Sequence, residues 1–147
     1  MGKFKIVVGD VFAVGINKNG IIIHGANCFK TMGAGVARTV ATKYREAYEA
    51  DVSDKRMPKQ KFGSFSYHDF GKFVIANAYT QFQPGANFDY QAIETALTAV
   101  RDKFTGRKFV FPEIGSGIAG GDKQMIENIM RHVFKNEHAT LVQWDGK

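Results

Sequence analysis

One stretch decides the fold of this chain: Phe109-Val110-Phe111-Pro112-Glu113-Ile114-Gly115-Ser116-Gly117-Ile118-Ala119-Gly120-Gly121-Asp122. An apolar run stops at a proline, four glycines follow among seven residues, and an Asp begins an apolar-periodic segment. This order predicts a strand, a loop and a helix. Glycines let a backbone adopt positive φ and approach a ligand, and a helix N-terminus offers unpaired N–H groups. The pattern is typical of a loop that holds a phosphate or diphosphate, although such loops serve many ligands.

Strands and helices alternate along the rest of the chain. Apolar runs predict strands at 4–8, 21–24, 62–67, 72–80 and 139–144, and 68–71 looks like a hairpin turn. Helical spacing of apolar residues predicts helices from 36 onward to about 48, over 93–104 and over 125–134. The polar, basic segment 51–61 is interpreted as a solvated surface connection. The sequence therefore predicts one α/β domain over residues 1–147, a three-layer α/β/α sandwich with a mixed sheet of about six strands.

Several polar or glycine-rich stretches follow predicted strands. In α/β folds of this kind, ligands bind beyond the carboxyl ends of the strands. We therefore expect two glycine loops, one at 31–35 and one at 112–121, to converge on one crevice. Asp10, His24, Asn27 and Gln81 are expected to lie at the same crevice.

Composition restricts the class of protein. The 20 Lys and Arg against 14 Asp and Glu give a net charge of +6, which favours anionic partners without choosing among them. A single cysteine, Cys28, excludes an internal disulfide framework and a cysteine metal cluster. No window approaches the roughly 20 apolar residues of a membrane span. We expect a cytoplasmic monomer that binds no membrane and needs no metal or cofactor.

Five motifs, in order along the chain, resemble those of a macrodomain, the ADP-ribose-binding α/β/α module. They are Gly9-Asp10-Val11, His24-Gly25-Ala26-Asn27-Cys28, Met32-Gly33-Ala34-Gly35-Val36-Ala37, Asn77-Ala78-Tyr79-Thr80-Gln81 and Pro112 through Asp122. Within the family, the sequence is most similar to the branch of ADP-ribose 1''-phosphate phosphatases and terminal ADP-ribose protein glycohydrolases. The resemblance spans nearly the whole chain.

The resemblance implies a role for each matching residue. Asp10 would accept a hydrogen bond from the adenine amino group, Asn27 would bind the distal ribose, and Trp144 would flank the adenine. His24 and Asp122 would share nucleophilic or acid–base duty. The remaining residues that would line the ligand are Val11, Met32, Gly33, Ala34, Gly35, Val36, Gln81, Gly115, Ser116, Gly117, Ile118, Ala119 and Gly120.

Each role competes with a structural one. An Asp after a strand forms turns, an Asn in a loop bonds backbone groups, and an Asp at a helix start is an N-cap that contributes about 1 kcal/mol. A histidine that ends an apolar run is often structural, and an aromatic residue at a strand end often packs at an edge. Cys28 is explained as a small buried thiol.

Four functions are open at this point. The first is removal of the phosphate from ADP-ribose 1''-phosphate, and the second is release of ADP-ribose from a protein or nucleic acid. The third is a non-catalytic ADP-ribose reader. The fourth, a nucleic-acid-binding module, rests on the net charge alone and ranks last, because the chain lacks an aromatic-interleaved basic motif.

Overall fold

The computed structural model describes residues 2–85, 89–114 and 121–146, and their strands form a mixed sheet of six. The strands are β1 (Lys3–Gly9), β2 (Ile21–Asn27), β3 (Phe65–Asp69), β4 (Val74–Gln81), β5 (Lys108–Pro112) and β6 (His138–Trp144). Their order across the sheet is β1-β6-β5-β2-β4-β3. Only the β3–β4 pair is antiparallel among the described pairs. The predicted mixed sheet of about six strands is confirmed.

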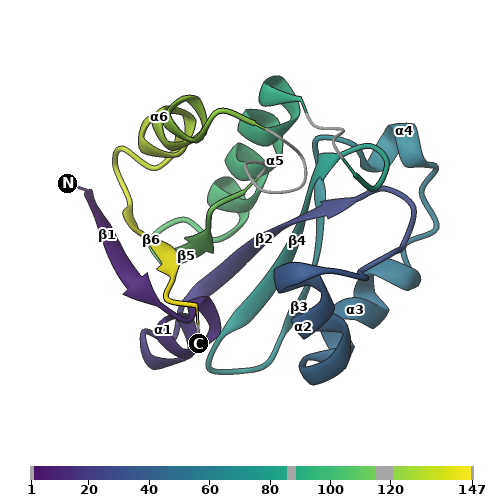
Figure 1. Cartoon of the computed structure of the whole chain (residues 1–147), viewed down its shortest axis with the longest axis horizontal. Helices are drawn as coiled ribbons and strands as arrows, with labels where there is room; N and C mark the ends of the chain where they lie inside the picture. Colours follow the sequence, from purple (N-terminus) through teal and green to yellow (C-terminus); the bar gives the residue numbers. More distant parts are fainter. Residues whose placement is uncertain (1, 86–88, 115–120, 147) are drawn as a thin grey trace.

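Helices cover both faces of this sheet (Figure 1). The helices are α1 (Val11–Asn17), α2 (Gly35–Lys43), α3 (Arg45–Val52), α4 (Pro58–Lys61), α5 (Tyr90–Lys103) and α6 (Lys123–Val133). Ile21 and Ile23 of β2 pack into the core under α5 and α6, whereas Ile22 between them packs into the core under α1 and α2. This alternation is the period of two that a strand buried on both faces requires. The predicted three-layer α/β/α sandwich is confirmed.

The order of the strands creates a crevice between β2 and β5. These strands are parallel neighbours, with Ile21 and Ile22 opposite Phe109 and Val110. The chain leaves β2 toward α2 on one face of the sheet and leaves β5 toward α6 on the other face. Adjacent strands whose connections diverge in this way form a topological switch point, where ligands of α/β proteins bind.

Three local predictions differ from the structure. Residues 11–17 form helix α1, where the sequence predicted no helix. Segment 51–61 is not a solvated loop throughout, because α3 extends to Val52, α4 spans Pro58–Lys61, and the side chains of Asp51 and Lys61 are buried. The predicted helix from residue 36 to about 48 is divided at Tyr44 into α2 and α3, because the Tyr44 backbone leaves helical geometry. No helix in the described parts of the chain is both long and apolar enough to cross a membrane.

Candidate ligand-binding pocket

A pocket of about 700 Å³ opens at the carboxyl ends of β2, β4 and β5, at the switch point. This volume lies within the range of small-molecule and cofactor sites. The described residues that line it come from the end of β2, the start of α2, the end of β4 and the segment after β5. They are His24, Gly25, Ala26, Asn27, Thr31, Gly33, Ala34, Gly35, Val36, Ala37, Thr80, Gln81, Pro84, Gly85, Pro112, Glu113 and Ile114.

The N-terminus of α2 forms one wall of this pocket. Ala34, its N-cap residue, makes no side-chain hydrogen bond to the helix, whereas α1, α5 and α6 are each capped by an Asp carboxylate. The first helical hydrogen bond of α2 runs from Arg38 N to Ala34 O. The N–H groups of Gly35, Val36 and Ala37 therefore have no acceptor within the helix. Unpaired N–H groups and the positive end of the helix dipole make this wall suited to an anion.

His24 lies at the bottom of the pocket and is only 1% exposed. Its Nε2 lies 2.6 Å from Asn77 Oδ1, and Asn77 Nδ2 donates to Ala47 O at 2.9 Å and Ser66 Oγ at 3.1 Å. Because the Asn77 amide donates on its other side, its oxygen must accept the proton of Nε2. Burial lowers the pKa of His24, although the hydrogen bond to Asn77 opposes this effect. The ring is therefore neutral near pH 7, with its proton on Nε2.

The other ring nitrogen, His24 Nδ1, is buried and lacks a hydrogen-bond partner among the described residues. In the tautomer fixed by Asn77, this atom is an acceptor. An unsatisfied buried polar atom costs about 1–3 kcal/mol. A ligand or water that donates a hydrogen bond to Nδ1 would remove this cost.

Asn27 and Gln81 shape the loops at the rim of the pocket. Asn27 Oδ1 accepts from Phe29 N at 2.8 Å, and Asn27 Nδ2 donates to the carbonyl and hydroxyl oxygens of Thr31 at 2.8 and 2.9 Å. Gln81 Nε2 donates to Gly85 O. Both side chains therefore have the structural role that competes with ligand binding, and Asn27 Oδ1 keeps one further lone pair for a ligand.

The structure brings seven of the predicted site residues to this pocket: His24, Asn27, Gly33, Ala34, Gly35, Val36 and Gln81. Val11 and Met32 lie behind the wall, in the core cluster that also contacts Val36. Gly115, Ser116, Gly117, Ile118, Ala119 and Gly120 lie outside the described residues.

Asp10, Asp122 and Trp144 are not among the described lining residues. Asp10 caps α1 by accepting from Phe12 N at 2.7 Å and Ala13 N at 3.3 Å. Asp122 caps α6 by accepting from Gln124 N at 2.8 Å and Met125 N at 3.2 Å. Trp144 is 74% exposed and pairs with Gly9, so it lies beside the β1–α1 turn that holds Asp10.

Sequence reasoning named seven of the described lining residues as site residues, and Glu113 and Gly25 are two of those that it missed. Glu113 lines the pocket and forms an ion pair with Lys123 at 3.3 Å; its position directly after β5 was the available signal. A Cβ on Gly25 would lie 2.9 Å from Thr80 Oγ1 and 3.1 Å from Ile114 Cγ2. Only a glycine lets the end of β2 approach these two neighbours so closely. No sequence pattern around Gly25 signals this contact, which is set by the tertiary structure.

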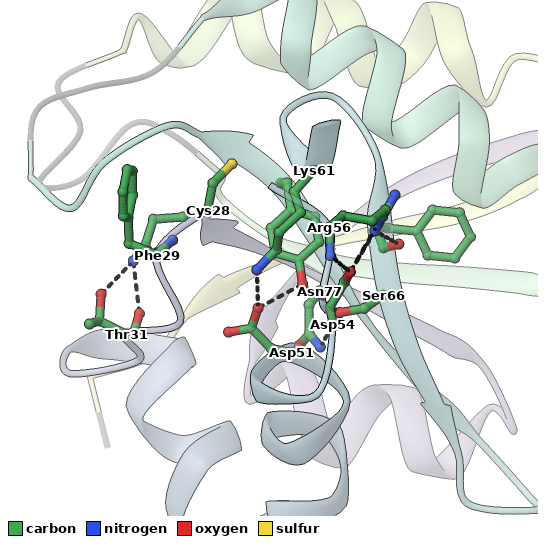
Figure 2. Close-up of polar contacts among 12 residues, drawn as sticks. Cys28, Phe29, Thr31, Asp51, Asp54, Arg56, Lys61, Ser66 and Asn77 are labelled. Atoms are coloured by element: carbon green, nitrogen blue, oxygen red, sulfur yellow. Dashed lines mark hydrogen bonds and ion pairs between the residues drawn. The ribbon is translucent and has the colours of Figure 1, made fainter. Parts of the chain in front are cut away.

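The Asn77 side chain connects His24 to a buried polar network through hydrogen bonds to both His24 and Ser66. Figure 2 shows Asn77 and Ser66 within this network. Ser66 Oγ lies 2.7 Å from the Tyr79 hydroxyl, which donates to Asp51 Oδ1 at 2.6 Å. Figure 2 shows Lys61 and Asp51 pointing toward each other, with 3.1 Å between Nζ and Oδ1. Burial and the hydrogen bond to Asp51 raise the pKa of Tyr79, so its hydroxyl keeps its proton.

Neither a thiol nucleophile nor a metal centre is indicated at the site. Cys28 is buried, and this burial raises its pKa to about 11, so the thiolate is scarce at neutral pH. Within 2–85, 89–114 and 121–146, no three His, Cys, Asp or Glu side chains are grouped so that they could hold a metal ion.

Solved structures show which fold this arrangement is. The macrodomain of Thermus aquaticus DarG superposes with a TM-score of 0.80 at 17% identity, over 97% of this chain and 99% of that one. Thermosipho africanus DarTG, solved in complex with ADP-ribose, superposes with a TM-score of 0.75 at 16% identity, over 98% of this chain and 42% of that one. The chain has the macrodomain fold.

At the level of sequence, no family model matches the chain. A protein of Enterobacteria phage T4, described as an uncharacterized 17.5 kDa protein in the tk-vs intergenic region, is 34% identical over 153 aligned residues and is matched over 96% of both chains. The chain belongs to the same family as this phage T4 protein.

Proposed function

We propose that this chain binds ADP-ribose in the pocket and removes the terminal phosphate of ADP-ribose 1''-phosphate. The observation that carries the proposal is the uncapped N-terminus of α2 in the wall of a pocket of about 700 Å³ at the switch point of a macrodomain fold. Its unpaired N–H groups would bind the diphosphate. The ADP-ribose complex of Thermosipho africanus DarTG, which shares the fold, supports the choice of ligand.

In this proposal, neutral His24 acts as the base. Its free Nδ1 accepts a proton from the water whose oxygen attacks the terminal phosphorus, while Nε2 keeps its own proton and donates a hydrogen bond to Asn77 Oδ1. The bond between this phosphorus and the 1'' oxygen breaks, and the leaving oxygen takes up a proton from solvent, which gives ADP-ribose and inorganic phosphate. The lowered pKa of His24 keeps the ring neutral at neutral pH, as the role of a base requires. Asp122 is proposed to take part in catalysis as well, and its carboxylate also caps α6.

Binding is tested by calorimetry with ADP-ribose and AMP. We expect a clear preference for ADP-ribose, because AMP lacks the diphosphate and the distal ribose. Equal affinities for the two ligands would contradict the proposed site. EDTA should leave the affinity unchanged, and a loss of binding on chelation would count against the metal-free site.

Turnover is tested with ADP-ribose 1''-phosphate, ADP-ribosylated protein and ADP-ribosylated DNA, with product analysis. His24→Ala should lower turnover by about 10²–10⁴ and leave ADP-ribose affinity within a few-fold. Asn27→Ala is the matched variant that should weaken binding instead. Release of free ADP-ribose from protein or DNA, without phosphate release, would replace the phosphatase with an ADP-ribosyl hydrolase.

A non-catalytic reader is the second candidate. It is favoured by the burial of His24 and by the capping hydrogen bonds that engage Asp122. A wild-type protein that binds ADP-ribose tightly but converts none of the three substrates would establish the reader and end the catalytic assignment.

A further inference from the structure

A second hollow, of about 260 Å³, lies at the opposite end of the sheet from the pocket. It is lined by Lys3, Lys5, Lys18, Lys108, His138, Ala139 and Thr140. Lys3, His138 and Lys108 begin β1, β6 and β5, whereas the pocket lies where strands end. We name the four lysines and His138 the basic hollow.

The sheet register places three of these basic side chains side by side. His138 is directly opposite Lys3 on β1 and directly opposite Lys108 on β5, so three basic side chains form one row across three parallel strands. Neighbouring strands are about 4.8 Å apart. Lys5, two residues further along β1, points to the same face, and Lys18 follows the C-terminus of α1.

No carboxylate neutralises the basic hollow among the residues that the structure describes. Its lining contains no Asp or Glu, and none of the ion pairs within the described ranges involves its lysines. Glu137, the neighbour of His138, directs Oε1 to Gly106 N at 3.0 Å. Lys3 and Lys108 lie on the two sides of His138, about 10 Å apart, and no carboxylate of the lining offsets their charge. The hollow is therefore suited to an anion.

Protection of the sheet edge explains only part of this arrangement. Lysines on an edge strand discourage pairing with another chain, and this accounts for Lys3 and Lys5 on β1. Lys108, however, lies on β5, which has β6 and β2 on its two sides, and Lys18 lies outside the sheet. The basic hollow brings these four lysines from three separate parts of the chain to one surface.

We propose that the basic hollow binds the phosphate backbone of duplex nucleic acid. Lys3 and Lys108 are two strand spacings apart, about 10 Å, so the cations suit successive phosphates better than one small anion. The lining includes no Phe, Tyr or Trp ring on which a single-stranded base could stack. Contacts of this kind are independent of nucleotide sequence and weaken steeply as salt is added.

The test is fluorescence anisotropy with a labelled DNA duplex of about 20 base pairs, and with the matching RNA duplex, over a salt series from roughly 50 to 200 mM. Lys3→Gln/Lys108→Gln is compared with Lys55→Gln/Lys59→Gln, which removes the same charge from two exposed lysines elsewhere. We expect the first pair to raise the Kd about tenfold and to reduce the salt slope by about 2. The control pair should change the Kd by less than about threefold. Lys5→Gln/Lys18→Gln provides a second test of the hollow.

ADP-ribose affinity, measured on the same proteins, is the readout for folding and should be unchanged, because the pocket lies at the other end of the sheet. Binding of either duplex with the expected loss supports the proposal. If the two double variants lose the same duplex affinity, the loss reflects net charge alone and the proposal is overturned. Binding of phosphatidylserine vesicles that depends on Lys3 and Lys108, with no duplex binding, would assign the hollow to lipid headgroups and also overturn it.

Discussion

The burial of His24 makes the stability of the fold depend on pH. Burial lowers the folded-state pKa of His24 below its ordinary value, so below about pH 6.5 the unfolded chain takes up a proton that the folded chain does not. The contribution to stability is complete above that pH and is lost as the pH falls, by up to about 1.4 kcal/mol per pH unit. Urea unfolding at about pH 7.5 and about pH 5.5 measures this loss.

The matched variant for this measurement is His24→Gln, which keeps a donor for Asn77 Oδ1 without a titrating ring. Its free energy of unfolding should fall less between the two pH values than that of the wild type. The same loss in both proteins would show that another group is responsible.

The two pocket glycines Gly25 and Gly33 differ in the space that surrounds them. A Cβ on Gly25 would meet Thr80 and Ile114 at 2.9 and 3.1 Å, whereas a Cβ on Gly33 would meet nothing within 4 Å. We expect Gly25→Ala to lower the free energy of unfolding by about 1–3 kcal/mol, as overpacking does. Gly33→Ala should leave it nearly unchanged. A stable Gly25→Ala protein in chemical denaturation would contradict the tight contact.

At the scale of elements, the N-terminus of α2 lacks a side-chain cap and also forms one wall of the pocket. Ala34→Asp would place a carboxylate beside the unpaired N–H groups, which should leave stability equal or raise it by up to about 1 kcal/mol. The same carboxylate should repel a diphosphate, so ADP-ribose affinity should fall by about tenfold or more. Calorimetry and thermal unfolding measure the two effects.

The control for this variant is Ala34→Asn, which is similar in size and shape but uncharged. It should weaken ADP-ribose binding less than Ala34→Asp does. If Ala34→Asp binds ADP-ribose as tightly as the wild type, the N-terminus of α2 does not face the diphosphate.

Long helices with a periodic pattern of apolar residues could be predicted from the sequence, whereas the short helix α1 could not. The helix expected over 93–104 corresponds to α5, and the one expected over 125–134 corresponds to α6. Helix α1 has only seven residues and includes Gly15, a residue that disfavours helices. A Cβ on Gly15 would lie 2.3 Å from Ile22 Cγ1, so the glycine is needed for α1 to pack on β2. This tertiary reason is invisible in the local sequence.

The candidate site was predictable where glycines and polar residues directly follow strands. His24, Asn27 and Gln81 reach one pocket because β2 and β4 are parallel neighbours. The hydrogen bonds that engage Asn27 correspond to the structural role that a loop Asn is expected to have. Glu113 directly follows β5, but the sequence does not show whether its side chain faces the pocket or solvent. Only the structure shows that it lines the pocket.

At the scale of the whole molecule, the buried Lys61–Asp51 pair joins α4 to α3 beneath the antiparallel end of the sheet. Both side chains are 1% exposed, and Lys61 Nζ lies 4.5 Å from the centre of the Tyr79 ring. Lys61→Met should lower the free energy of unfolding by about 3–5 kcal/mol, because it leaves Asp51 buried without its cation. Urea unfolding of purified protein measures this change.

The matched control is Lys61→Met/Asp51→Leu, which removes both charges. Its stability should exceed that of Lys61→Met, because replacing both members of a buried pair by apolar residues is often nearly neutral. A double variant less stable than the single one would mean that Asp51 contributes more through Tyr79 than through Lys61. This pair could not be predicted from the sequence, because its two members are ten positions apart in a polar segment.

The pairing of β1 has a consequence for synthesis on the ribosome. Within the described sheet, β1 is an edge strand whose neighbour is β6, and β6 is the last of the six strands to be translated. The first strand to be made must therefore wait, with Phe4 and Val7 not yet packed against the cores and its backbone unpaired, until nearly all of the described chain has emerged. The five other strands can assemble before it, so docking of β1 onto β6 is expected to be a late event in the maturation of the nascent protein.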